Sequence, residues 1–263
     1  ERLDKIEIDG VQLDVFPVQD YRFVLRLRGE GLSEFISETD PQVTGAAPLT
    51  VKPLVLGATR TAALVNEFVA QAGKLLAEEE RTNMVLLRGF ARLPDLPPMG
   101  DVYRLNTAGI AAYPMYRGLA EVAGMKVIPT GHTFGDEVET LRQNYNNHDF
   151  FFIHYKPADA AGEDGDFDAK VKCLEDLDPF IPQIRELEPD VFLVAGDHST
   201  PAIMAAHSWH PVPFMLHSKL TRGEGVPGFN ERTCAQGSVG SILATQVMLL
   251  AMSHAGKLNK YGP

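Results

Sequence analysis

Carboxylate and imidazole side chains gather in three segments of the second half of the chain. Asp159 and Glu163 are separated by a short glycine-containing stretch, Asp197 and His198 are adjacent, and His207 follows farther along. Carboxylate oxygens and imidazole nitrogens are donors that hold divalent cations in proteins. Five such donors suffice for a two-metal site, whose ions lie roughly 3.5–4 Å apart. The residue types therefore predict a pair of divalent cations.

Each of these groups also has a structural interpretation. Asp197 could accept backbone hydrogen bonds in a turn that His198 merely caps, and a lone histidine such as His207 is more often structural than a ligand. Asp159 and Glu163 could belong to a solvated acidic loop. If a turn brings these two carboxylates together, one is pushed to be protonated unless a cation lies between them. The metal interpretation thus depends on the three segments meeting.

Basic residues in apolar or glycine-rich surroundings are candidates for holding an anionic substrate. Arg88, which we predict at the end of a strand, suits a bidentate grip on phosphate or carboxylate. Arg117 and Lys156 are further candidates of this kind. Arg22 and Arg28 could equally lie along a sheet with their charges in water.

The segment that follows His198 is typical of a helix start rather than of a nucleophile with its base. Ser199 or Thr200 would cap that helix, and Pro201 would lie in its first turn. The sequence contains no GxxxxGK(S/T), GxGxxG, HExxH or GxSxG motif. It therefore shows none of the common signatures of nucleotide-binding loops, zinc proteases or serine hydrolases.

The elements that must position these groups alternate between strands and helices. Apolar runs at 150–154 and 191–195 predict buried strands, each leading into one of the acidic segments, and a strand at 212–216 follows His207. Such alternation is typical of a parallel sheet covered by helices on both faces. Ligands bind such sheets at the carboxyl ends of the strands, so we expect the three segments to meet there.

A proline-rich stretch divides the chain into two predicted domains. The first, 1–102, is a small α+β module whose strands alternate apolar and polar residues, and the second, 103–263, is the α/β domain. The remaining predicted strands are 5–8, 11–18, 21–28, 83–89, 108–112 and 125–129, and the predicted helices are 58–80, 115–123, 136–146 and 166–177.

Composition excludes several classes of protein. The 263 residues include 24 Lys and Arg against 35 Asp and Glu, which gives a net charge of -11. Because this charge repels phosphate, we expect neither a nucleic-acid partner nor a membrane partner. The most apolar stretch, 242–252, is too short to span a bilayer. Two distant cysteines, Cys173 and Cys234, are typical of reduced thiols in a cytoplasmic protein.

Several motifs along nearly the whole chain combine in a way that is specific to one family. They are Gly-Asp-His-Ser-Thr-Pro at 196–201, Asp-x-x-Gly-Glu-Asp-Gly-Asp-Phe-x-Ala-Lys-Val at 159–171, His-Ser-x-x-Pro-Val-Pro at 207–213, Arg-Phe-Val-Leu-Arg-Leu-Arg-Gly-Glu-Gly-Leu-Ser at 22–33, Thr-Asp-Pro at 39–41, Leu-Leu-Arg-Gly at 86–89 and Cys-Ala-x-Gly at 234–237. This combination resembles the archaeal-type cofactor-independent (2,3-bisphosphoglycerate-independent) phosphoglycerate mutases of the alkaline phosphatase superfamily.

The resemblance implies an alkaline-phosphatase-like α/β fold, with a mostly parallel sheet flanked by helices and with 1–102 as an inserted substrate-binding domain. It implies an isomerase that interconverts 3-phosphoglycerate and 2-phosphoglycerate in glycolysis and gluconeogenesis. The family uses a metal-activated phosphoserine and no 2,3-bisphosphoglycerate. The implied partner is accordingly a small phosphorylated substrate.

The resemblance also implies roles for individual residues. Asp197 and His198 would hold one divalent metal ion, and Asp159, Glu163 and His207 would hold the other. Substrate would be bound by Arg88 and Arg117, with Lys156 as a further candidate.

The chain departs from the family at two points. Glu163 stands where the wider family usually has His, and its anionic oxygen favours Mn²⁺ or Mg²⁺ over Zn²⁺. The family's opening segment, with an Asp-Gly metal ligand and the nucleophilic serine, has no counterpart in this sequence, so we expect the chain alone to be inactive. Two alternatives stay open: a metal-dependent phosphatase or phosphonate hydrolase on the same scaffold, and a non-catalytic remnant.

Overall fold

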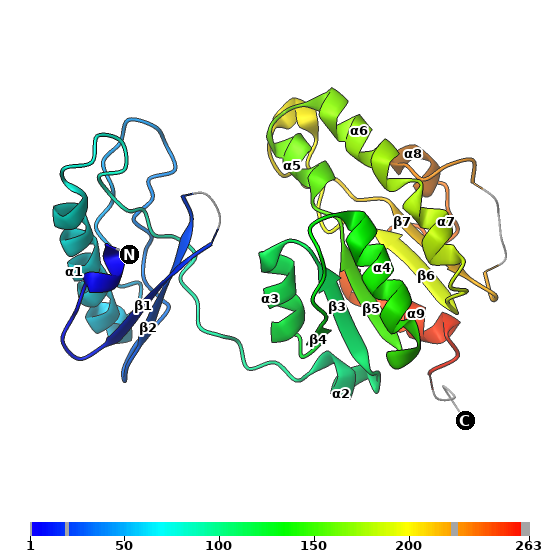
Figure 1. Ribbon diagram of the computed structural model, residues 1–263, viewed down its shortest axis with the longest axis horizontal. Helices are drawn as coiled ribbons and strands as arrows, with labels where there is room; N and C mark the ends of the chain where they lie inside the picture. Colours follow the sequence, from blue (N-terminus) through cyan, green and yellow to red (C-terminus); the bar gives the residue numbers. More distant parts are fainter. Residues whose placement is uncertain (1, 19–20, 222–225, 259–263) are drawn as a thin grey trace. The chain divides into compact units, whose positions relative to one another are not determined.

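The computed structural model describes residues 2–18, 21–221 and 226–258. The chain forms two compact units, Glu1–Asp95 and Leu96–Pro263 (Figure 1). The division falls within the proline-rich stretch, seven residues before the predicted boundary at 102, so that α2 (Met99–Tyr103) belongs to the second unit.

The first unit is a β-hairpin and a long helix around an apolar core. Strands β1 (Gln12–Pro17) and β2 (Phe23–Arg28) pair antiparallel, as the alternating pattern predicts. Helix α1 (Thr59–Leu76) buries the predicted face, with Val65 and Phe68 fully enclosed. It ends four residues before the predicted end, at Leu76. Short 3₁₀ turns precede the two elements, at Leu3–Lys5 and Leu56–Ala58.

Two predicted strands of this unit are wrong, at 5–8 and 83–89. Ile6, Ile8, Val85 and Leu87 are buried, so the alternation of period two does reflect burial. Neither segment forms a strand ladder, however. The backbone at Leu87 is satisfied by one residue instead, since its N–H donates to the Thr39 hydroxyl at 2.6 Å and its carbonyl accepts from the Thr39 N–H at 2.9 Å. Arg88 is therefore not at a strand end.

The second unit carries the parallel sheet. Strands β3 (Thr107–Ala111), β4 (Lys126–Val127) and β5 (Phe150–His154) lie in the order β4-β3-β5, with both pairings parallel. The α/β class with a parallel sheet is thus confirmed. Strands β6 (Val191–Ala195) and β7 (Phe214–Ser218) form a second ladder that is antiparallel, which differs from a fully parallel arrangement.

Helices flank both ladders and share one core with them. Side chains from the sheet, from α4 and from α7 pack together, among them Ile110, Val138, Ile184 and Phe192. Figure 1 shows α4 in front of the strands and α9 behind them. The helices after α2 are α3 (Pro114–Val122), α4 (Phe134–Asn144), α5 (Pro157–Glu163), α6 (Phe167–Leu177), α7 (Phe180–Arg185), α8 (Glu231–Cys234) and α9 (Val247–His254), with 3₁₀ turns at Tyr145–Asn147, Ala202–Met204 and Ala244–Gln246.

Residues Pro157–Glu163 form helix α5, whereas the sequence interpretation expected a turn between Asp159 and Glu163. Pro157 is the first residue of the helix, where a backbone N–H would have no partner within the helix, so its missing N–H costs no hydrogen bond. Alanines, which favour helices, follow it. Gly162 lets the helix approach the segment after β6, because a Cβ there would lie 2.4 Å from the Thr200 carbonyl oxygen. The helical spacing places Asp159 and Glu163 one turn apart on one face.

No helix within the described ranges has both the length and the apolar character needed to cross a membrane. The apolar stretch near the end of the chain forms the 3₁₀ turn Ala244–Gln246 and the short helix α9.

Candidate metal centre

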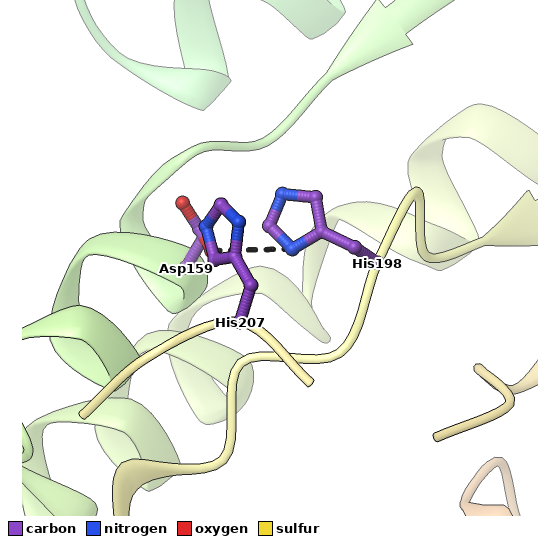
Figure 2. Close-up of side chains that lie close together, drawn as sticks. All are labelled: Asp159, His198 and His207. Carbon is purple, nitrogen blue, oxygen red and sulfur yellow. Dashed lines mark ion pairs between the residues drawn. The ribbon is translucent and has the colours of Figure 1, made fainter. Parts of the chain in front are cut away.

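Three segments bring the predicted ligands together beside the carboxyl ends of β5 and β6. Asp159 lies in the first turn of α5, which follows β5, while His198 lies in the loop after β6 and His207 in the segment that leads to β7 (Figure 2). A backbone bridge joins the last two segments, with the Ser208 N–H donating to the Ser199 carbonyl at 2.8 Å. This bridge holds the two imidazoles beside each other, with ring centroids 3.8 Å apart.

One set of donors gathers around Asp159. Ligand atoms of Asp159, His198 and His207 all lie within 4.8 Å of one another. The His207 Nε2 atom is 3.7 Å from Asp159 Oδ1 and 3.3 Å from Glu163 Oε1. Asp159 and His198 are half-buried and His207 is exposed, so the set is open to solvent on one side. Its oxygen and nitrogen donors fit a divalent cation.

A second set gathers around Asp197. Its Oδ2 atom lies 3.5 Å from His198 Nε2, and its Oδ1 atom accepts the His198 backbone N–H at 3.0 Å. His198 therefore presents one ring nitrogen to Asp197 and the other toward Asp159, with Nδ1 at 3.7 Å from Asp159 Oδ1. The five predicted ligands thus form two neighbouring groups that share His198 between them.

Tyr116, which sequence reasoning missed, supports Asp197. Its hydroxyl donates to Asp197 Oδ2 at 2.8 Å from helix α3, 81 positions away in sequence. The buried Tyr116 ring stacks on His154 at the end of β5, with centroids 3.2 Å apart. Burial lowers the pKa of His154 to about 4, so this imidazole is neutral at physiological pH.

The electrostatics keep both aspartates ionised. Partial burial opposes ionisation of Asp159, but hydrogen bonds from Lys156 and Thr200 outweigh it and lower the pKa of the carboxyl. Burial likewise opposes ionisation of Asp197, and there the Tyr116 hydroxyl and the neighbouring His198 lower the pKa. Ionised carboxylates are the form that binds a cation, so the donor set suits divalent metal ions.

Lys156 lies among the carboxylates. Its ammonium donates to Asp159 Oδ2 and lies 3.6 Å from Glu163 Oε2. The same ammonium stands over the Tyr113 ring, 5.8 Å from its centroid. Burial alone would lower the pKa of Lys156, but the bond to Asp159 raises it, so the group is a cation. Substrate binding by Lys156 stays a prediction.

The two predicted substrate arginines lie in different units. Arg117 is half-buried on α3, directly after Tyr116. Arg88 belongs to the first unit, where its exposed guanidinium pairs with Asp40 at 3.6 Å. Substrate binding by both residues stays a prediction.

The predicted role of Thr200 as a helix cap is wrong. Thr200 caps no helix, since the following turn, Ala202–Met204, has Pro201 at its cap and no side-chain capping bond. Instead its hydroxyl donates to Asp159 Oδ1 at 2.5 Å. The one signal in the sequence was its position two residues after His198, but nothing there shows which carboxylate it meets.

Two family models match the chain. Residues 69–254 match the family model described as Metalloenzyme superfamily, and residues 1–82 match that of the 2,3-bisphosphoglycerate-independent phosphoglycerate mutases. A probable 2,3-bisphosphoglycerate-independent phosphoglycerate mutase of Thermotoga maritima is 44% identical over 262 residues, which are 100% of this chain and 65% of that protein. A counterpart in Thermus thermophilus is 43% identical, over 97% of this chain and 64% of that protein.

Solved structures resemble the chain as well. The PH0037 protein from Pyrococcus horikoshii has a TM-score of 0.71 and 27% identity, over 79% of this chain and 60% of that one. The cofactor-independent phosphoglycerate mutase from Thermoplasma acidophilum shares the fold, with a TM-score of 0.66 and 22% identity, over 97% of this chain and 68% of that one. The expected alkaline-phosphatase-like fold is confirmed. The chain spans about 65% of the length of its Thermotoga relative.

Proposed function

The chain belongs to the Metalloenzyme superfamily, and from that premise we propose that it serves a 2,3-bisphosphoglycerate-independent phosphoglycerate mutase reaction. The substrate would be a small phosphorylated molecule, 3-phosphoglycerate or 2-phosphoglycerate, and no 2,3-bisphosphoglycerate would take part. The observation that carries the proposal is the meeting of Asp159, His198 and His207 from three separate segments. Two relatives with the mutase name, at 43–44% identity, support it.

The donor sets support two divalent ions. Asp197 and His198 would hold one ion, and Asp159, Glu163 and His207 the other. Bound there, the ions would supply Lewis-acid stabilisation of the charge that develops on a transferring phosphoryl group. Glu163 adds a hard anionic oxygen, which supports Mn²⁺ or Mg²⁺ over Zn²⁺.

The chain's own residues would bind and orient the rest of the substrate. Arg117 carries a guanidinium suited to a bidentate grip on phosphate or carboxylate, and Arg88 offers the same chemistry from the first unit. The first unit would act as the substrate-binding domain. Lys156, whose ammonium contacts Asp159 and Glu163, would be a further group that binds the substrate.

The conditions implied by the chain are those of the cytoplasm. Cys173 and Cys234 are free thiols, which suits a reducing compartment. The proposed interconversion of 3-phosphoglycerate and 2-phosphoglycerate would belong to glycolysis and gluconeogenesis.

The reaction is tested with the gene's full-length product, Mn²⁺ and 3-phosphoglycerate, followed by ³¹P NMR. Conversion to 2-phosphoglycerate supports the proposal, with loss of that conversion in the His198→Ala variant. Release of free phosphate alone would instead identify a phosphatase, because water rather than glycerate then receives the phosphoryl group. No reaction and no bound ion at saturating Mn²⁺ would identify a non-catalytic remnant.

A further inference from the structure

Thr200 occupies the place where the two donor sets meet. Its side chain is buried, with 4% of the residue exposed. The hydroxyl lies 2.5 Å from Asp159 Oδ1 on one side and 3.0 Å from His198 Nδ1 on the other. It thus touches one carboxylate of the first set and the imidazole that stands between both sets.

Elements on both sides hold Thr200 in this position. The Lys170 ammonium of α6 donates to the Thr200 carbonyl at 2.5 Å. Gly162 of α5 packs against the same carbonyl, at a distance that leaves no room for a Cβ. The bridge between Ser199 and Ser208 fixes the adjoining residue. The hydroxyl is therefore part of a fixed framework rather than of a loose loop.

The hydrogen-bonding capacity of these groups sets the direction of the chain of bonds. A threonine hydroxyl has one proton to donate, and an ionised carboxylate can only accept. Asp159 is held as a carboxylate by the Lys156 ammonium on its other oxygen. The Thr200 proton must then point to Asp159, and toward His198 the hydroxyl oxygen can only accept. His198 Nδ1 accordingly carries a proton.

We propose that Thr200 is a positioning residue that holds the proton of His198 on Nδ1, so that the neutral ring offers Nε2 as its metal-binding atom. The free Nε2 atom is the one that lies 3.5 Å from Asp197 Oδ2. Thr200 thereby assigns His198 to the ion held with Asp197, and keeps it out of the set formed by Asp159, Glu163 and His207. This inference rests on the proposed metal centre.

The alternative arrangement is close at hand, which is why a selecting residue matters. His198 Nδ1 lies only 3.7 Å from Asp159 Oδ1. Without the Thr200 hydroxyl, Nδ1 could lose its proton to Nε2 and turn its lone pair toward Asp159. Which ring nitrogen of a histidine binds a metal ion is ordinarily decided by the hydrogen bond that the other ring nitrogen makes. Here that second bond is made by a side-chain hydroxyl that also binds a ligand carboxylate.

The direct test reads the tautomer without any metal. The 263-residue chain labelled with ¹⁵N-histidine is studied by long-range ¹H–¹⁵N NMR, and the His198 signals are assigned from their loss in His198→Ala. We expect Nδ1 to be protonated in the unchanged chain and in Thr200→Ser, which keeps a hydroxyl. In Thr200→Val, and in Thr200→Ala as a second removal of the hydroxyl, we expect Nε2-protonated His198. An unchanged tautomer in a folded valine or alanine variant overturns the inference.

Metal binding gives the second readout and separates this inference from the proposed function. Free Mn²⁺ is titrated against the chain and followed by EPR. Loss of a residue that orients a ligand weakens metal binding by about 10- to 100-fold, so we expect that loss in Thr200→Val and near-normal binding in Thr200→Ser. If His198→Ala binds Mn²⁺ as well as the unchanged chain, the metal centre itself is wrong. If His198→Ala is weakened and Thr200→Val is not, only the role of Thr200 is wrong.

Discussion

Two carboxylates lie near the carboxyl ends of the paired strands β3 and β5, and their surroundings shift their pKa values in opposite directions. Glu137 reaches from α4 to the residue after β3, where one oxygen accepts the Ala112 N–H at 2.7 Å. Only 2% of Glu137 is exposed, and burial raises its pKa to about 7. Asp159, which follows β5, has a lowered pKa, because hydrogen bonds from Lys156 and Thr200 outweigh its partial burial.

The difference lies in the donors rather than in the position along the sheet. Within the described part of the chain, the second oxygen of Glu137 is buried without a hydrogen-bond partner. Asp159 instead faces an ammonium, a hydroxyl and an imidazole. Hydrogen-bond donors and a nearby cation keep the Asp159 carboxyl in its ionised form, which is the form that can bind a metal ion. Among the described residues, the second oxygen of Glu137 has no such donor, and Glu137 serves the fold.

The strongest challenge to this comparison is a matched pair of amide substitutions. In Asp159→Asn the loss of the anionic oxygen should weaken Mn²⁺ binding by more than about 100-fold, since even residues that only orient ligands account for about 10- to 100-fold. In Glu137→Gln the affinity should stay within about twofold, because the side chain is not among the proposed ligands. Calorimetric titration of both variants gives the answer. Equal losses of affinity would mean that the two carboxylates do not differ as described.

The second prediction concerns stability against pH. Unfolded Glu137 ionises near its ordinary value of 4.5, whereas the folded group keeps its proton to about 7. The stability that it contributes is therefore fully present below pH 4.5 and is lost as the pH rises through 7. The difference between the folded and unfolded pKa values of Glu137 corresponds to at most about 3 kcal/mol of unfolding free energy. Local relaxation reduces the expected loss to about 2 kcal/mol.

Urea unfolding at pH 5 and pH 8 measures this loss. Glu137→Gln should remove that part of the pH dependence and be the more stable protein at pH 8. Glu139→Gln, an exposed position on the same helix, is the control and should follow the unchanged chain. Identical pH profiles for the Glu137→Gln variant and the unchanged chain would show that the buried carboxyl does not titrate as the structure indicates.

The main elements of the fold follow from sequence where periodicity and burial coincide. The apolar run 150–154 became β5, and the pattern at 58–80 became α1 with Phe68 in the core. Prediction failed where burial alternates without a ladder, as at Val85 and Leu87, because side-chain periodicity does not show what the backbone bonds to. The antiparallel pairing of β7 on β6 was missed for a related reason, since strand direction depends on the path of the connection.

The candidate site divides in the same way. Ligand types and their place after strands predicted that Asp159, His198 and His207 would meet, because parallel strands bring such positions to one edge. The supporting residues were beyond prediction. Tyr116 meets Asp197 only through tertiary packing of α3, and Thr200 carries a local cap signal that the long-range bond to Asp159 overrides.

The smallest expected effect comes from Tyr116→Phe, which removes one donor from Asp197 and keeps the ring stacked on His154. Losing that hydrogen bond raises the pKa of Asp197 and frees its carboxylate to rotate, so protons compete better with metal. We expect Mn²⁺ affinity to fall about tenfold at pH 7, the lower end for a residue that orients a ligand, and to fall further at pH 5. Tyr113→Phe, on the neighbouring ring, is the matched control. Unchanged affinity at both pH values would show that Asp197 needs no donor beyond His198, and that the Tyr116 hydroxyl is not part of what distinguishes Asp197 from Glu137.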